Sequence, residues 1–391
     1  MYDVIVVGAG PSGSMTALTC ADLKMDVVVV EKEKMPRLKT CGGSVSLKAL
    51  KLIRSKIPNE VVESYYKGFR LFSPNLNSID VISDQPIGIT THRDRFDSFL
   101  LQQAIDSGSN VIESNEVVDV KILKNKVECK LKDGAVLEGK ILIGADGAYG
   151  KTAKMAGIRE RWRKDEIGVC LESSCQLNKS SKAQNIINRA ILELYFLNIP
   201  LGYAWLFPKK KDVSIGIGGC LAYLKKPRDL FTDFLLMISK TKKVKIKVSN
   251  ISTHLAPAGG FKRDYFTDRV LLVGDAAGFI DPLSGEGIYY AMKSGIIAAE
   301  ACNKAVKADE FERSFFEKCY RKSCENQFGK DLGIALNLTN FLHTHLSLLF
   351  DQLRKNPEYL LDTVTGNKTY RNYRRKILFL KLAAYLKREK G

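Results

Sequence analysis

A short apolar strand that runs into a glycine-rich turn opens the chain, and this feature constrains the fold more than any other. Residues 3–7 read DVIVV and residues 8–13 read GAGPSG. Helical spacing follows, and a second apolar run, VVVV, stands at 27–30. A strand, a glycine turn, a helix and a second buried strand make a βαβ unit. We therefore expect a parallel α/β sheet near the start of the chain.

The glycines of this turn, Gly8, Gly10 and Gly13, have the spacing of a dinucleotide-binding loop. Glycine permits the tight turn, a close approach of backbone to a pyrophosphate, and close packing of helix on strand. Glu31 ends the second strand, where a carboxylate can accept hydrogen bonds from both hydroxyls of an adenosine ribose. An acid there argues against a 2′-phosphate, so the sequence predicts FAD or NAD. A glycine turn without a ligand is the alternative.

Two later segments, each a strand that ends in glycine and aspartate, favour FAD over NAD. Residues 142–150 read LIGADGAYG, and residues 270–292 read VLLVGDAAGFIDPLSGEGIYYAM. Asp275 lies where a strand gives way to a helix, so its carboxylate could bind a ribityl hydroxyl. Gly285 and Gly287 could expose a second helix N-terminus to the pyrimidine oxygens of a flavin. The alternative for Asp275 is an ordinary helix cap.

The motifs of the chain occur in an order that is known from one group of flavoproteins. They are GAGPSG, CGG at 41–43, RDRFD at 93–97, ADG at 145–147, GYAWLFP at 202–208 and GDAAGFIDPLSGEGI at 274–288. Over roughly residues 1–305 the chain resembles FAD-dependent oxidoreductases of the p-hydroxybenzoate hydroxylase fold. Within that group it resembles the geranylgeranyl reductase family, and the archaeal digeranylgeranylglycerophospholipid reductases in particular. Ser44 is a departure from those archaeal members, which often have another glycine shortly after the cysteine.

The resemblance implies a set of flavin contacts in this chain. Arg93 precedes a helix and could face the pyrophosphate, although an arginine in that position can equally be a solvated charge. Val117 is carried over from a backbone contact to adenine. The cofactor-binding residues expected in total are Gly8, Gly10, Ser12, Gly13, Glu31, Cys41, Gly42, Arg93, Val117, Asp146, Gly147, Asp275, Gly287 and Ile288.

Three aromatic residues, Tyr203, Trp205 and Phe207, alternate on a predicted strand and should therefore point to one face of a sheet. A flat apolar surface suits a flexible polyene because it asks for no hydrogen bonds. An aromatic stripe seen alone is more often ordinary core. The resemblance reverses that preference and makes the three residues candidate substrate contacts in an isoprenoid tunnel.

Cys41 is the candidate catalytic residue. Beside paired glycines and below a flavin, its thiol could shape the pocket or donate a proton, whereas most cysteines are inert small hydrophobes. We expect the other eight of the nine cysteines to be inert and reduced. His254, His343 and His345 lack the spacing of metal ligands, so no metal site is expected.

The chain has 391 residues, 45% of them hydrophobic, which is enough for two packed domains. The expected fold class is α/β, a Rossmann-like FAD-binding domain with an inserted antiparallel-sheet substrate domain and a helical C-terminal region. The boundaries we expect are 1–80, 92–160 and 255–305 for the FAD-binding domain, 81–91 and 161–254 for the substrate domain, and 306–391 for the helical basic region.

Lys and Arg exceed Asp and Glu by 61 to 43, a surplus of 18 positive charges. Such a surface attracts anionic ligands, lipid or nucleic acid. A nucleic-acid-binding protein is therefore a rival hypothesis, but no nucleic-acid module is recognisable.

Residues 368–391 combine basic ends with the apolar centre ILFLKLAAYL, so they could lie on anionic lipid or pack on the domain. The start of the chain does not fit a signal peptide and no apolar span is long enough to cross a bilayer, so we expect a cytoplasmic protein, with peripheral contact on the inner face of the cell membrane as its route to lipid.

The activity that the resemblance implies is the reduction of carbon–carbon double bonds in geranylgeranyl chains of membrane lipids or their precursors. Reduced FAD would deliver hydride from N5, and a proton would reach the neighbouring carbon. NAD(P)H or ferredoxin is the expected external reductant, and the isoprenoid lipid is the expected partner. The alternative is a flavin-dependent monooxygenase or halogenase of the same fold.

Overall fold

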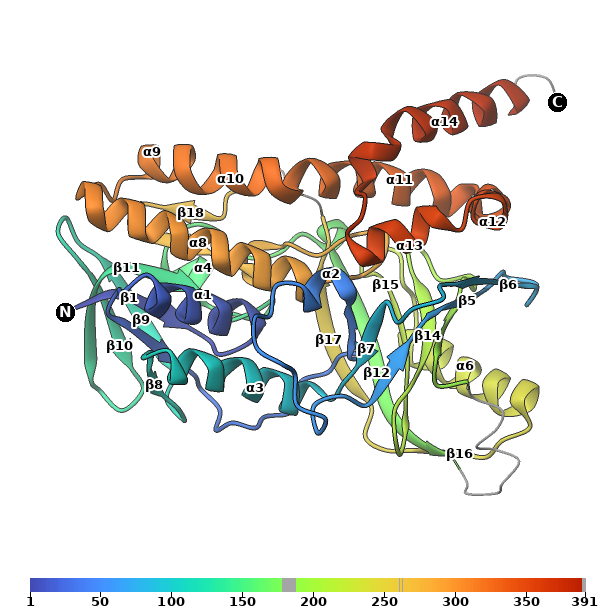
Figure 1. Cartoon of the computed structure of the whole chain (residues 1–391), viewed down its shortest axis with the longest axis horizontal. Helices are drawn as coiled ribbons and strands as arrows, with labels where there is room; N and C mark the ends of the chain where they lie inside the picture. The colour runs from blue at the N-terminus through green and yellow to red at the C-terminus, as the bar shows by residue number, and fades with distance from the viewer. Residues whose placement is uncertain (178–187, 260, 262, 389–391) are drawn as a thin grey trace. The chain divides into compact units, whose positions relative to one another are not determined.

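The computed structural model describes residues 1–177, 188–259, 261 and 263–388, with side chains described as far as residue 381. These residues form two compact units (Figure 1), and each unit is built from three segments of the chain. Unit 1 comprises Met1–Lys39, Arg93–Ile167 and Leu255–Leu332, and unit 2 comprises Thr40–His92, Gly168–His254 and Gly333–Gly391.

Apart from residues 92 and 161–167, which shift a boundary by seven residues or fewer, the units differ from the expected domains in two places. Residues 40–80 were expected in the FAD-binding domain but belong to unit 2. The reason is that strand β5 (Gly68–Phe72) pairs in parallel with β13 (Ile191–Tyr195) in the sheet of unit 2. The expected C-terminal region is divided, since residues 306–332 pack in unit 1 and the chain from 333 belongs to unit 2. Residues 178–187 and 389–391 of the expected domains lie outside the described residues.

A parallel sheet forms the centre of unit 1, with β1 between β11 and β2. Its strands are buried on both faces, as the unbroken apolar runs of β1 and β2 predict. The strand order is β18 (Phe266–Thr267), β19 (Val270–Leu272), β11 (Val136–Gly144), β1 (Tyr2–Val7), β2 (Val27–Val30) and β8 (Asn110–Ile112), with β9 (Val117–Ile122) and β10 (Val127–Leu131) joined to β11.

Helices cover this sheet, and α1 lies beside α8 in Figure 1. Their approach requires Gly295, because a Cβ there would lie 2.4 Å from the carbonyl oxygen of Ser12. The main helices of unit 1 are α1 (Pro11–Asp22), α3 (Arg93–Asp106) and α8 (Ile288–Ala308). Shorter ones are α4 (Thr152–Met155), α7 (Gly274–Ala277), α9 (Arg313–Phe316) and α10 (Lys322–Cys324), the last two joined to α11 (Lys330–Thr344) by π-helical turns.

Unit 2 is built on a mixed, mainly antiparallel sheet. Its strand order is β16 (Ile246–Val248), β12 (Ile167–Leu177), β15 (Val213–Cys220), β14 (Tyr203–Pro208), β13, β5 and β6 (Ser78–Ile82), and β17 (Ser252–Pro257) also pairs with β12. A separate three-stranded sheet contains β3 (Ser44–Ser46), β7 (Gly88–Thr90) and β4 (Ser64–Tyr66).

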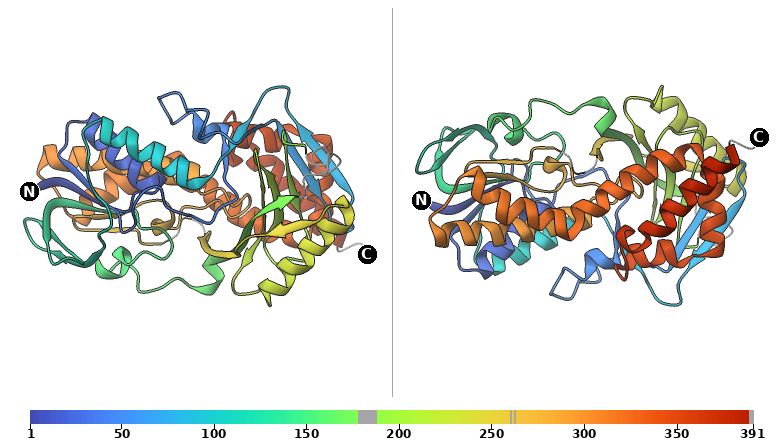
Figure 2. Two further views of the ribbon diagram at one scale, coloured as in Figure 1. Left: turned by 90° about the horizontal axis from the view of Figure 1, so that it is seen from below. Right: turned by 90° about the horizontal axis from the view of Figure 1, so that it is seen from above.

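Helices pack on both faces of the large sheet. On one face, Phe234 of α6 (Pro227–Lys242) contacts Tyr195 edge to face at 5.1 Å. On the other, Phe350 of α12 (Leu346–Lys355) packs in a cluster with Phe69 and Leu71 of β5. Figure 2 shows α12 and α13 (Glu358–Thr365) beside β5 and β6. Among the described residues, no helix is long and apolar enough to cross a membrane.

Candidate functional site

The glycine turn of unit 1 has the geometry that the sequence predicts for a nucleotide loop. Gly8 has φ +103°, a conformation that favours glycine. A Cβ on Gly13 would lie 1.9 Å from the carbonyl oxygen of Gly8, so only glycine fits where α1 meets β1. Gly10 precedes the helix, and among the described residues no side chain caps that end. The first turn of α1 is therefore open to an anion.

Glu31 faces this loop from the end of β2. Its Oε2 accepts a hydrogen bond of 2.7 Å from the Ala9 amide, and its Oε1 accepts one of 3.1 Å from the Glu33 amide. The carboxylate is almost fully buried. It is therefore held rigidly beside the loop, where the adenosine ribose of a dinucleotide would lie.

Basic side chains beside Glu31 form an ion-pair cluster that the motifs did not predict. Arg37 Nε lies 3.6 Å from Glu31 Oε2, and Arg37 Nη2 lies 3.3 Å from Asp97 Oδ2. Arg93 makes two bonds with Asp97, of 2.7 and 2.9 Å, so it is an ion-paired residue and not a solvated charge. Burial lowers the pKa of Lys39, and Asp275 opposes this shift. A signal was available, since two of these cations stand in the short segment between Glu31 and the CGG motif.

Asp275 lies in the first turn of α7, directly after β19. A Cβ built on Gly287 would be 3.4 Å from Asp275 Oδ1, so this carboxylate faces the N-terminus of α8, which begins at Ile288. Gly274 has φ +55° and permits the sharp exit from the strand. The structure thus brings together Asp275, Gly287 and Ile288, as the resemblance implies.

Asp146 and Val117 have structural roles in unit 1. Asp146 Oδ2 accepts hydrogen bonds from the amide and the hydroxyl of Thr152, at 2.9 and 2.8 Å, and so caps α4. Its Oδ1 is buried and lacks a hydrogen-bond partner among the described residues, and burial raises the pKa of this carboxyl. Gly147 follows with φ +76°. Val117 opens β9 and is buried.

The residues of unit 1 fit a dinucleotide cofactor. An uncapped helix start, the buried carboxylate of Glu31 and the carboxylate of Asp275 lie at the carboxyl ends of β1, β2 and β19. Ligands of open α/β sheets bind at that edge. The glycine loop also provides the close backbone approach that a pyrophosphate requires.

In unit 2, Tyr203, Trp205 and Phe207 form what we call the aromatic ladder. Neighbouring ring centroids are 6.4 and 6.3 Å apart, so the three rings share one face of β14, as expected from their alternation. The facing strand β15 makes room for them, because Gly216 pairs with Trp205 and a Cβ there would lie 2.1 Å from the indole. The indole of Trp205 therefore explains why residue 216 is glycine.

The CGG segment packs directly on the aromatic ladder. A Cβ on Gly42 would lie 2.8 Å from a ring carbon of Phe207, and one on Gly43 would lie 2.1 Å from the carbonyl oxygen of Thr91. The Gly43 amide donates to Cys41 Sγ at 3.4 Å. Cys41 and Gly42 therefore belong to unit 2 with the ladder, whereas the other expected flavin contacts belong to unit 1.

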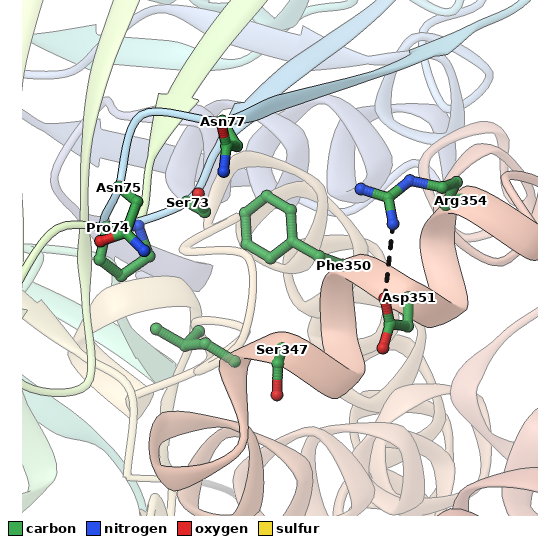
Figure 3. Close-up of a pocket in the computed structure, with 9 residues that line it drawn as sticks. Ser73, Pro74, Asn75, Asn77, Ser347, Phe350, Asp351 and Arg354 are labelled. Carbon is green, nitrogen blue, oxygen red and sulfur yellow. Dashed lines mark hydrogen bonds and ion pairs between the residues drawn. The ribbon is translucent and has the colours of Figure 1, made fainter.

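One cavity of unit 2, of about 360 Å³, lies between the β5–β6 turn and α12 (Figure 3). Its lining includes Ser73, Asn75, Phe350 and Arg354, and Arg354 pairs with Asp351 at 3.4 Å. None of the residues expected at the site lines it. The ring centroids of Phe350 and Phe196 are 5.8 Å apart. The cavity therefore borders the apolar cluster in which Phe350 packs on β5.

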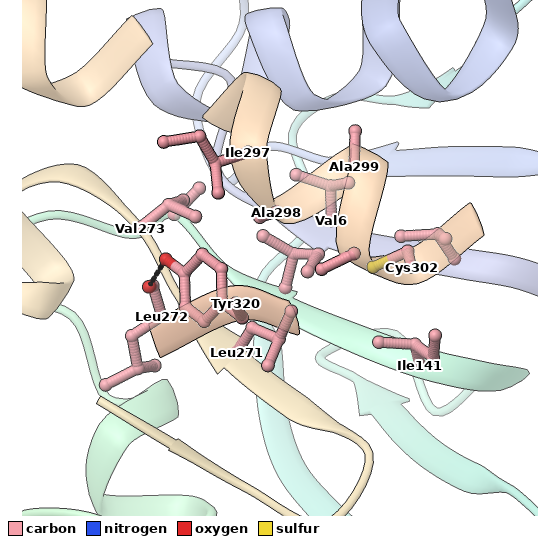
Figure 4. Close-up of a cluster of buried hydrophobic side chains, with 14 of the residues drawn as sticks. Val6, Ile141, Leu271, Leu272, Val273, Ile297, Ala298, Ala299, Cys302 and Tyr320 are labelled. Atoms are coloured by element: carbon pink, nitrogen blue, oxygen red, sulfur yellow. Dashed lines mark hydrogen bonds between the residues drawn. The ribbon is translucent and has the colours of Figure 1, made fainter. Parts of the chain in front are cut away.

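All nine cysteines are free thiols, and most of those other than Cys41 are buried. Cys302 lies in the apolar core of unit 1 with Val6, Ile141 and Ala298 (Figure 4). Burial raises the pKa of Cys129 to about 12 and raises that of Cys302 as well, so both thiols stay protonated and unreactive. Among the described residues, no group of His, Cys, Asp and Glu could hold a metal ion.

Comparisons with known proteins decide the family. The chain matches the FAD binding domain family over residues 1–193. It is 30% identical to the digeranylgeranylglycerophospholipid reductase of Methanocaldococcus jannaschii over 82% of this chain and 83% of the relative, and 30% identical to that of Methanosarcina acetivorans over 87% and 84%. The chain belongs to the geranylgeranyl reductase family. The resemblance seen in the sequence is thereby confirmed, and this family member is an FAD-dependent oxidoreductase.

Solved structures of other proteins share the fold of this chain. A geranylgeranyl bacteriochlorophyll reductase-like protein from Thermoplasma acidophilum has a TM-score of 0.80 at 24% identity and covers 88% of this chain and 87% of its own. A flavin-dependent brominase has a TM-score of 0.77 at 18% identity, with both chains fully covered. At these identities the likeness concerns the fold alone, and it confirms the expected α/β class for this geranylgeranyl reductase family member.

Proposed function

We propose that the protein reduces carbon–carbon double bonds in the geranylgeranyl chains of a membrane lipid or of its precursor. The observation that carries the proposal is the packing of the Cys41–Gly42–Gly43 segment on the aromatic ladder, in a chain whose relatives are named digeranylgeranylglycerophospholipid reductases. An apolar aromatic face beside a thiol provides both a surface for a polyene and a proton source.

The aromatic ladder would hold the isoprenoid chain. Three rings on one sheet face offer a continuous apolar surface, and the alkene chain needs no polar partner along it. Cys41 is partly exposed, in contrast to the buried cysteines of both units. Its thiol would donate the proton to one alkene carbon, since an isolated trisubstituted alkene accepts hydride poorly unless protonation accompanies it.

Unit 1 would hold the cofactor. FAD, when bound and reduced, supplies the hydride. Glu31 would accept from the ribose hydroxyls, the first turn of α1 would face the pyrophosphate, and Asp275 would bind the ribityl chain. Arg37 and Lys39 would supply positive charge against the phosphates, a role that we expected from Arg93.

The external reductant in this proposal is NAD(P)H or ferredoxin. The surplus of 18 positive charges supports an acidic protein donor, because complementary charge speeds the encounter of two proteins. Peripheral contact with anionic lipid would occur through α14 (Arg374–Arg388), where Leu378 and Phe379 are 68% and 76% exposed beside three consecutive basic residues, 374–376.

The decisive experiment is an anaerobic single turnover. Protein with dithionite-reduced FAD is mixed with a digeranylgeranyl glycerophospholipid, and flavin oxidation and lipid mass are followed together. We expect the lipid to gain two hydrogens for each flavin oxidised. A product that appears only in air and carries one added oxygen would instead support the flavin monooxygenase alternative.

A further inference from the structure

The ladder face of unit 2 contains a buried carboxylate that neither the sequence motifs nor the proposed chemistry uses. Glu172 lies on β12 and pairs with Gly216 of β15, which in turn pairs with Trp205 of β14. Side chains of directly paired residues share a face. Glu172 and Trp205 therefore lie on the same face of the sheet, with Gly216 of the intervening strand β15 between them.

Hydrogen bonds join this carboxylate to both halves of the site in unit 2. Glu172 Oε2 accepts a bond of 2.8 Å from the backbone amide of Cys41, across 131 residues of sequence. Glu172 Oε1 accepts a bond of 2.6 Å from the Ser214 hydroxyl. Ser214 Oγ accepts a bond of 3.0 Å from the indole Nε1–H of Trp205. A single chain of contacts thus runs from the ladder to the CGG segment.

The direction of these bonds follows from the donors. An indole N–H and a peptide N–H can only donate, so the Ser214 hydroxyl hydrogen is directed to Glu172 and the carboxylate accepts at both ends. Burial raises the pKa of Glu172, while the Ser214 bond, the charge of Lys209 and the Cys41 amide favour the ionised form. A buried carboxylate that receives two donors is held in one orientation.

We propose that Glu172 is a positioning residue for the reduction, which fixes the Cys41 segment at its distance from the aromatic ladder. The inference rests on the proposed function for its catalytic consequence. Gly42 packs on Phe207, so any shift of the segment moves the Cys41 thiol relative to the ladder surface along which the alkene would lie. A displacement of about 1 Å at a reacting group can cost about 10²-fold in rate.

The test compares two substitutions of Glu172 with a matched control. Glu172→Leu keeps the volume but removes both acceptors, whereas Glu172→Gln keeps one acceptor for the Cys41 amide. The control is Glu193→Leu, which removes another buried carboxylate of the same sheet. Glu193 pairs with Leu206 on the opposite face and bonds Lys242 at 2.8 Å.

Two readouts are measured on FAD-loaded protein: the anaerobic single-turnover rate, and the alkylation rate of Cys41 by iodoacetamide, resolved by peptide mass spectrometry. We expect Glu172→Leu to retain FAD, to lose about 10²-fold in rate and to alkylate several-fold faster at Cys41. Glu172→Gln should restore most of both values. Glu193→Leu should leave both near wild type.

Each other result overturns the inference. A Glu172→Gln variant as slow as Glu172→Leu would show that the charge or its proton matters and not the position. Wild-type alkylation in Glu172→Leu would show that the segment needs no such anchor. If Glu172→Leu does not fold, Ser214→Ala replaces it, since it frees one carboxylate oxygen and should raise Cys41 alkylation to a smaller extent.

Failure of the proposed function gives a different pattern. If none of the geranylgeranyl lipids oxidises the reduced flavin of the wild-type protein, the proposed function fails. The alkylation comparison still decides whether Glu172 holds the Cys41 segment.

Discussion

At the residue scale, Cys41 is the group whose role is most open to direct test. If its thiol donates the proton, the Cys41→Ala variant should still bind FAD and accept electrons. Its rate of alkene reduction should fall by about 10²- to 10⁴-fold, the range of general acid catalysis. Cys41→Ser should be similarly slow, because a hydroxyl is a far weaker acid than a thiol. Anaerobic single-turnover oxidation of reduced flavin measures both. Wild-type rates in the two variants would leave a bound water as the proton source.

Glu31 gives a second prediction at this scale, for cofactor affinity. Glu31→Ala removes the acceptor for the ribose and for the Ala9 amide, so FAD binding should weaken by about 1.5 to 3 kcal/mol, the range for hydrogen bonds to a charged group. Titration of apoprotein with FAD, followed by flavin fluorescence, gives the change in Kd. Glu33→Ala is the control, because Glu33 bonds Glu31 through its backbone amide, which the substitution leaves in place. Equal Kd values in both variants would contradict the ribose role.

At the scale of elements, sequence patterns predicted the features that depend on neighbouring residues in the chain. The strand, glycine turn and helix at the start of the chain follow from spacing alone, and so does the single face of the aromatic ladder. The sequence could not show that β5 joins the sheet of unit 2, because this pairing with β13 links residues more than a hundred positions apart. Glu172 was missed for the same reason, since a lone glutamate in a strand resembles a solvated one until its partners are known.

The glycines of β15 provide the test at this scale. Gly216→Ala would place a methyl group 2.1 Å from the Trp205 ring, so the ladder must shift and stability should fall by roughly 1 to 3 kcal/mol. Gly333→Ala is the matched control, since it lies in α11 with open space around it and should stabilise by up to about 1 kcal/mol. Thermal unfolding of FAD-loaded protein compares them. A lowered Tm in both variants would contradict the packing argument.

At the scale of the whole molecule, the positive surplus and the exposed apolar side chains Leu378 and Phe379 of α14 bear on the same question, which is contact with lipid. A basic surface alone attracts many anions, and the sequence left lipid contact and helix docking equally open. The structure adds that Leu378 and Phe379 are exposed, while Lys381 Nζ donates to the carbonyl oxygen of Asn337 at 3.1 Å. Apolar side chains that face outward beside basic ones are typical of helices that lie in a lipid interface.

Vesicle binding tests this arrangement on the full chain. The double variant Leu378→Asp and Phe379→Asp should weaken co-sedimentation with anionic phosphatidylglycerol vesicles, because it removes about 1.5 to 3 kcal/mol of apolar burial per side chain and adds repulsive charge. Leu236→Asp, on α6, is the control, since it changes another leucine that is 63% exposed and adds one of the same charges. Raised salt should weaken wild-type binding, because surface charges are screened. Equal losses in the two variants would mean that net charge alone, and not the apolar face of α14, holds the protein to lipid.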